Sequence, residues 1–148
     1  MTLRTKIADD MKAAMKAREA RRLSAIRLLL AAVKQREVDE RKDLSDPEVI
    51  SVIEKMMKQR RDSIGQFLAA GRQDLVDQET FELNLLADYL PKQLADDQLA
   101  REVSEAIAQT GAKGPADMGK VMGALKGKLA GRADMGRVSA LVKAKLAG

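Results

Sequence analysis

A surplus of positive charge and most of the glycines lie in the last third of the chain, where together they could bind a polyanion. Between residues 107 and 148, eight basic residues stand against Asp117 and Asp134, a surplus of six positive charges. Clustered basic charge is typical of a surface that binds a phosphate polymer, although helix surfaces rich in lysine and arginine can simply be solubilising. The candidate binding residues are Lys120, Lys126, Lys128, Arg132, Arg137, Lys143 and Lys145, with Gly123 and Gly127 between them.

The glycines of this segment are regularly spaced. Eight of the 10 glycines lie from Gly111 onward, and four of them recur at intervals of four: Gly119, Gly123, Gly127 and Gly131. On a helix these four would lie within a sector of about 120°, opposite the apolar residues and around Lys120. Three interpretations stay open: a neighbouring helix crosses closely, a phosphate backbone approaches while lysines neutralise it, or the helix is weakened with no special role.

A second basic run lies nearer the N-terminus. From Lys12 to Arg36 eight basic residues stand against Glu19, a surplus of seven charges. This run carries the same polyanion signal, with the same alternative of a solvated helix surface.

Residues for catalysis are scarce. The chain has no histidine and no cysteine, which removes the commonest general base, thiolate nucleophiles and the usual zinc ligands. Phosphate-loop and nucleophile-elbow motifs are absent, and the acidic pairs Asp9–Asp10 and Asp96–Asp97 are typical of helix starts. The sequence therefore predicts a non-catalytic protein with no cofactor and no metal site.

The elements that position these residues are predicted to be helices, because apolar residues recur with a period of 3.6. Thr2 is expected to cap a first helix with an apolar face of Leu3, Ile7, Met11, Ala14 and Met15. A second helix is expected to bury Leu23, Ile26, Leu30 and Val33. A capping box at Ser45–Glu48 opens a third helix that ends at Gly71, and a fourth runs from about residue 73 to 90, before Pro91.

The C-terminal part contains an internal repeat. Residues 117–129 align with residues 134–146 at an offset of 17, with seven of 13 positions identical. Two helices of about 13 residues with a short turn fit this spacing. The preceding helix is expected to be capped at Asp96–Asp97 and to end at Gly111.

These elements predict an all-α fold in two parts. We expect an N-terminal helical domain of about four helices over residues 1–94 and a smaller three-helix domain over residues 95–148, with residues 91–97 as the boundary. The longest apolar run, Leu28–Val33, is far too short to span a bilayer. No membrane association is expected, and the cytoplasm is the expected location.

Four segments together resemble the signature of the YqeY family: Gly71–Leu75, Tyr89–Leu94, Met118–Met122 and Gly131–Asp134. The resemblance covers the whole chain, and Met135 departs from its pattern. This family is similar to the helical tail of the B subunit of the tRNA-dependent amidotransferase. That enzyme converts Glu-tRNA(Gln) or Asp-tRNA(Asn) to the amide form with glutamine; its tail contacts tRNA, and its chemistry resides in other domains.

The resemblance implies an all-α protein that recognises tRNA, or a tRNA-bearing enzyme such as an amidotransferase or an aminoacyl-tRNA synthetase. The basic residues given above would then be RNA-binding. With Phe67, Phe81 and Tyr89 as its aromatic residues, the chain would read RNA backbone and shape, not sequence. Two alternatives are an accessory module that docks on a protein through the glycine face, and a carbon–nitrogen ligase with glutamine as amido donor.

Overall fold

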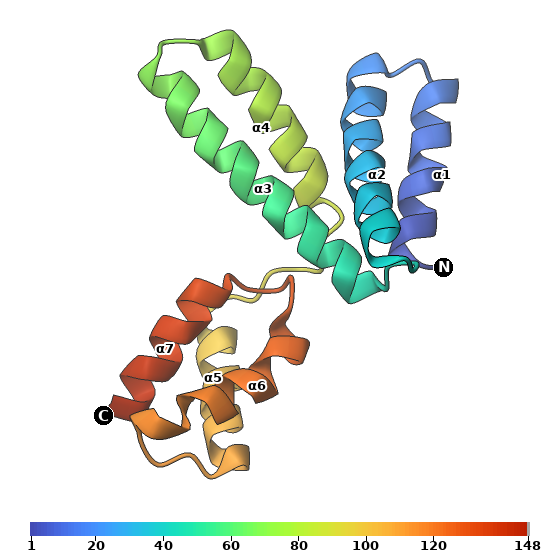
Figure 1. Ribbon diagram of the computed structural model, residues 1–148. Helices are drawn as coiled ribbons and strands as arrows, with labels where there is room; N and C mark the ends of the chain where they lie inside the picture. The colour runs from blue at the N-terminus through green and yellow to red at the C-terminus, as the bar shows by residue number, and fades with distance from the viewer. Residues whose placement is uncertain (148) are drawn as a thin grey trace. The chain divides into compact units, whose positions relative to one another are not determined.

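The computed structural model describes residues 1–147, which form seven α-helices and one short 3₁₀ helix with no β-strand among them. The predicted all-α class is confirmed. The chain divides into two compact units, Met1–Leu90 and Pro91–Gly148 (Figure 1). Independent folding of two domains, with a boundary after residue 94, stays a prediction.

The first unit consists of two helical hairpins. Helices α1 (Leu3–Lys16) and α2 (Ala20–Glu40) form one, and α3 (Asp46–Ala69) and α4 (Gln73–Ala87) form the other (Figure 1). Their apolar faces meet in a single core. The most deeply buried side chains of this core are Ile7, Ile26, Leu29, Val33, Val49 and Ile53.

Local sequence explains where these helices begin and end. The hydroxyl of Thr2 accepts a hydrogen bond from the Thr5 N–H at 3.1 Å, as its predicted capping role requires. At the start of α3, the Glu48 carboxylate accepts hydrogen bonds from the N–H of Ser45 at 3.2 Å and its hydroxyl at 2.8 Å. Gly71 follows α3 with φ +69°, a conformation that favours glycine.

Two expectations for the first unit are wrong. Helix α4 ends at Ala87, about three residues earlier than expected; Tyr89 follows in a turn, and its hydroxyl donates to Asp10 at 2.7 Å. Met15 was expected in the core, but its side chain is 48% exposed. It lies in the last turn of α1, where Ala14 provides the buried contact.

The second unit contains α5 (Asp96–Thr110), the 3₁₀ helix η1 (Pro115–Asp117), α6 (Met118–Leu129) and α7 (Met135–Ala147). Gly111 ends α5 as predicted, with φ +69°. The expected cap at Asp96 is wrong by one residue: Ala95 holds that position, and its N–H donates to the Gln98 side chain at 3.2 Å. Asp96 and Asp97 lie in the first turn, where their charge complements the helix dipole.

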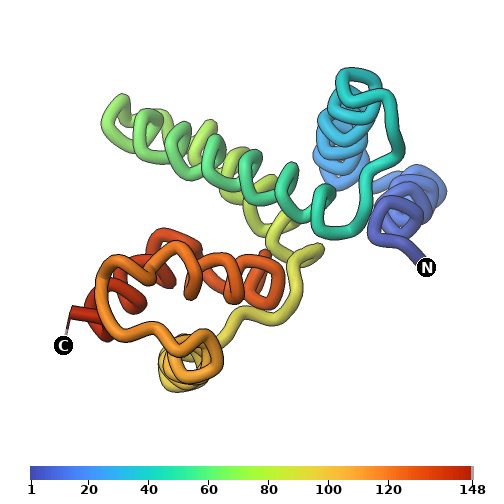
Figure 2. The backbone as a smooth tube through the Cα atoms, turned by 60° about the horizontal axis from the view of Figure 1, so that its bottom comes forward, coloured from blue at the N-terminus to red at the C-terminus, as the bar shows by residue number. Residues whose placement is uncertain are grey.

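The repeat forms the two helices that its spacing predicts, as the backbone of Figure 2 shows from orange to red. Equivalent apolar residues of the two repeats are buried in the same core: Val121 and Val138, Leu125 and Val142, Leu129 and Leu146. The repeat is therefore a structural one. None of the helices within residues 1–147 combines the length and the apolar character that crossing a membrane needs.

Candidate nucleic-acid interface

The glycines of α6 lie on the exposed side of the helix. Gly119, Gly123 and Gly127 are exposed, and a Cβ atom added to any of them would meet no atom within 4 Å. Their equivalents in α7 are also small and exposed: Gly136, Ala140 and Ala144. Among the described residues of the second unit no helix packs against the glycines of α6, so the close-crossing interpretation is wrong for a helix of this unit.

Gly131 does not belong to this exposed stretch. Helix α6 ends at Leu129, and Gly131 is buried in the turn before α7 with φ +74°. The Gln93 side chain donates to the carbonyl of Gly131, and the Leu94 N–H donates to the carbonyl of Arg132 at 2.9 Å. Gly131 therefore lies in a turn, and three of the four regularly spaced glycines share the exposed side of α6.

Three of the seven candidate cations bond to α5 of the same unit. Lys128 forms an ion pair with Glu102 at 2.7 Å, and this contact raises the pKa of the lysine. Arg137 pairs with Asp96, and Lys145 donates to Ser104 and to the Ala100 carbonyl. These contacts link α6 and α7 to α5. RNA binding by these three residues stays a prediction.

The other lysines of the set have no such bond. Lys120, Lys126 and Lys143 are exposed, and no hydrogen bond or ion pair joins them to a residue of the described chain. Lys126 and Lys143 hold the same position in the two repeats, just as Lys128 and Lys145 do. The repeat thus places one lysine toward α5 and one toward solvent in each helix.

We use the term α6–α7 basic surface for Lys120, Lys126 and Lys143 together with the three exposed glycines of α6. Among the described residues no ion pair joins its three lysines to a carboxylate, and the glycines present helix backbone without side chains. Such a surface can hold phosphate groups by charge and allow a backbone to approach closely. Arg132, which is half-buried, lies next to this surface in the chain, at the turn between the helices.

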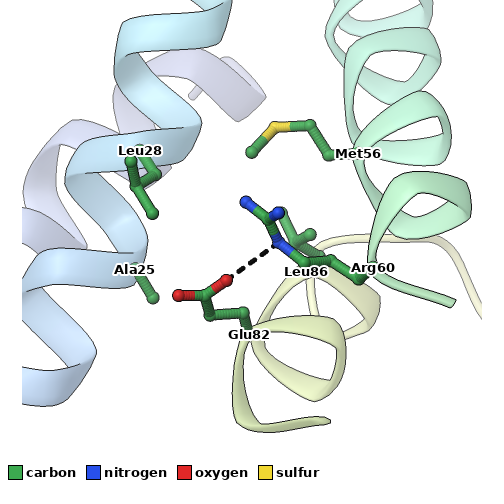
Figure 3. A pocket seen from close by; sticks show the side chains of 6 residues that line it. All are labelled: Ala25, Leu28, Met56, Arg60, Glu82 and Leu86. Atoms are coloured by element: carbon green, nitrogen blue, oxygen red, sulfur yellow. Dashed lines mark ion pairs between the residues drawn. The ribbon is translucent and has the colours of Figure 1, made fainter. Parts of the chain in front are cut away.

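The part of the chain that the structure describes holds no candidate metal centre beside this surface. In residues 1–147 no group of three acidic residues could hold a metal ion. A hollow between α2, α3 and α4 is lined by Leu28, Met56 and the ion pair of Arg60 with Glu82, 2.8 Å apart (Figure 3). The space does not admit a water molecule, so these side chains pack the first unit together.

Comparison with known proteins gives a family and several relatives. A family model described as "Yqey-like protein" matches residues 4–146. "Altered inheritance of mitochondria protein 41, mitochondrial" of Eremothecium gossypii is 39% identical over 97 residues, which cover 63% of this chain and 53% of that protein. The protein of the same name from Saccharomyces cerevisiae strain YJM789 is 29% identical over 125 residues, covering 80% and 68%.

A third relative of the same name, from Kluyveromyces lactis, is 38% identical over 82 residues, or 55% of this chain and 44% of that protein. The chain spans about half the length of the first of these relatives. Their names place those proteins in mitochondria. The cytoplasmic location expected for this chain stays a prediction.

Proposed function

The chain belongs to the YqeY family, and on that premise we propose that it is a non-catalytic RNA-binding protein whose expected ligand is tRNA. The observation that carries this proposal is the α6–α7 basic surface, where exposed lysines have no bond within the described chain. The resemblance to the tRNA-contacting tail of the amidotransferase B subunit supports tRNA as the RNA. A tRNA-bearing enzyme, either an amidotransferase or an aminoacyl-tRNA synthetase, would be encountered through the same RNA.

The lysines that are not bonded to α5 suit this function better than the paired ones. Lys128 must exchange its bond to Glu102 for a phosphate, whereas Lys120 and Lys126 exchange only water and counterions. Each phosphate that a lysine neutralises releases counterions from the RNA, which makes the affinity depend strongly on salt. Without aromatic residues in α6 and α7, the surface would follow backbone and shape.

The test is the salt dependence of binding to total tRNA, measured by fluorescence anisotropy. Lys120→Ala/Lys126→Ala/Lys143→Ala should lower the slope of log affinity against log salt by about 2–3, or about one for each phosphate that is no longer neutralised. The control is Lys55→Ala/Lys58→Ala/Arg61→Ala, which removes three exposed charges from α3 and should change the slope by less than about 1. Equal slopes for the two variants, or wild-type binding that is insensitive to salt, would contradict the proposal.

A second candidate is an accessory module that docks on a protein, and the open glycine stretch of α6 favours it. A flat helix side without side chains can receive a partner helix at close range. In that case the chain would co-purify with a protein after ribonuclease treatment and would not bind tRNA at low salt. Release of the partner on ribonuclease treatment supports the RNA proposal instead.

A further inference from the structure

The basic run of α1 and α2 is not explained by a function of the second unit. Some of its residues have partners within the first unit: Arg36 pairs with Glu40, and Arg21 donates to the Asp77 carbonyl and stacks on Phe81. Arg22 lies 3.9 Å from Glu19. The remaining five are exposed, with no hydrogen bond or ion pair to the described residues: Lys12, Lys16, Arg18, Arg27 and Lys34.

The pair of Arg4 and Glu37 fixes how α1 and α2 lie against each other. The Arg4 guanidinium, near the start of α1, donates to both oxygens of the Glu37 carboxylate, near the end of α2, at 2.8–3.0 Å. Residues 17–19 join the end of α1 to the start of α2. The hairpin is therefore antiparallel, with this pair on the line of contact. On α1 the core side is marked by Ile7, and on α2 by Leu29.

Counting about 100° per residue from these core residues shows which cations share a face. Around the axis of α1, Arg4 lies beside the core side, and Lys12 lies farther from the core side in the same direction of rotation. Around the axis of α2, Glu37 lies beside the core side, and Arg27 and Lys34 lie farther from the core side in the same direction of rotation. Lys12, Arg27 and Lys34 therefore lie together on the outer face of the hairpin, away from the core.

Their spacing along the helices is also close. At about 1.5 Å per residue, Lys12 lies about 12 Å along α1 from Arg4, while Lys34 and Arg27 lie about 4.5 and about 15 Å along α2 from Glu37. All three are displaced in the same direction, toward the turn that carries Arg18. Glu37, which lies on this contact line, already accepts hydrogen bonds from Arg4 and from the Leu44 N–H at 3.0 Å.

We infer that this outer face, the α1–α2 basic surface of Lys12, Arg27 and Lys34, is a second RNA-contacting surface that binds the sugar–phosphate backbone. The inference rests on the proposed function, because it assigns the same RNA to both units. A chain with two linked surfaces binds more tightly than either surface alone, since binding at one raises the effective concentration of RNA at the other. Removing the charges of either surface should then weaken binding without abolishing it.

The experiment compares Lys12→Ala/Arg27→Ala/Lys34→Ala in the full chain with the variants of the α6–α7 basic surface and of α3 described above. The α1–α2 variant should bind total tRNA about tenfold or more weakly than the wild type. Its salt slope should be lower by about 2–3. Charge-retaining Lys12→Arg/Arg27→Lys/Lys34→Arg should bind like the wild type. Far-UV circular dichroism checks folding, which alanine on exposed helix positions should preserve.

The outcomes separate the two proposals. If the α1–α2 variant matches the α3 control while the α6–α7 variant loses affinity, the second surface is refuted and the proposed function stands. If the wild type shows no salt-dependent affinity for tRNA, the proposed function fails and this inference fails with it. If the charge-retaining variant binds as weakly as the alanine variant, charge is not what the surface contributes, and the inference is overturned.

Discussion

Replacing Leu125 with alanine is expected to destabilise the second unit by about 2–5 kcal/mol, because it leaves a cavity in the core. The Leu125 side chain is 1% exposed and belongs to the cluster formed by α5, α6 and α7. Amide hydrogen exchange in these helices, followed in the full chain, measures the destabilisation of this unit. A change below about 1 kcal/mol would contradict the buried position of Leu125.

Gly123, two residues away on α6, provides the matched control. A Cβ atom there meets nothing within 4 Å, so Gly123→Ala should stabilise the unit by about 0.5–1 kcal/mol through helix propensity alone. Opposite signs for the two substitutions would show that α6 buries its leucine side and leaves its glycine side open. Destabilisation by Gly123→Ala would instead show that something packs against the glycines.

Replacing Glu37 with alanine is expected to destabilise the first unit by about 2–3 kcal/mol. The Glu37 carboxylate is 9% exposed; it holds Arg4 from α1 and accepts the buried N–H of Leu44, so its removal leaves both without a partner. Arg4 is 41% exposed and can return to water, which keeps the effect below that of breaking a fully buried ion pair. Urea unfolding of the full chain, with amide exchange to assign the transition, measures the effect.

The same contact predicts a pH dependence. Hydrogen bonds from Arg4 and the Leu44 N–H lower the pKa of Glu37 in the folded chain. Its stabilising contribution is therefore complete above the ordinary glutamate pKa of about 4.3 and disappears as pH falls through the lowered value. The stability difference between wild type and Glu37→Gln should shrink as pH falls below about 4. A difference that stays constant down to about pH 2 would contradict this role of the carboxylate.

The parts of the fold that were predicted from sequence are those that depend on nearby residues. The capping box of Ser45 and Glu48 involves only four consecutive residues. Gly111 ends α5 because glycine readily adopts the left-handed conformation found there. The repeat identified α6 and α7 because its apolar positions recur in register. Such signals need no knowledge of the rest of the chain.

The parts that were missed depend on contacts distant in sequence. Helix α4 ends at Ala87, and Tyr89, two residues beyond, donates to Asp10, 79 residues away. A count of charges likewise cannot separate Lys126 from Lys128, since the difference lies in Glu102 of another helix. Gly131 fits the four-residue spacing but lies in a turn, where Gln93 bonds to its carbonyl and Leu94 to that of Arg132.

The binding of RNA to the α6–α7 basic surface is tested most directly by NMR of the ¹⁵N-labelled full chain during addition of unlabelled tRNA. The amide signals of Gly119, Gly123 and Gly127 should shift or broaden at low salt and recover when salt is raised. Gly65, in α3, and Gly71, in the turn between α3 and α4, should keep their signals in the same titration. Unchanged signals of the three α6 glycines in a sample where tRNA is bound would contradict RNA binding at this surface.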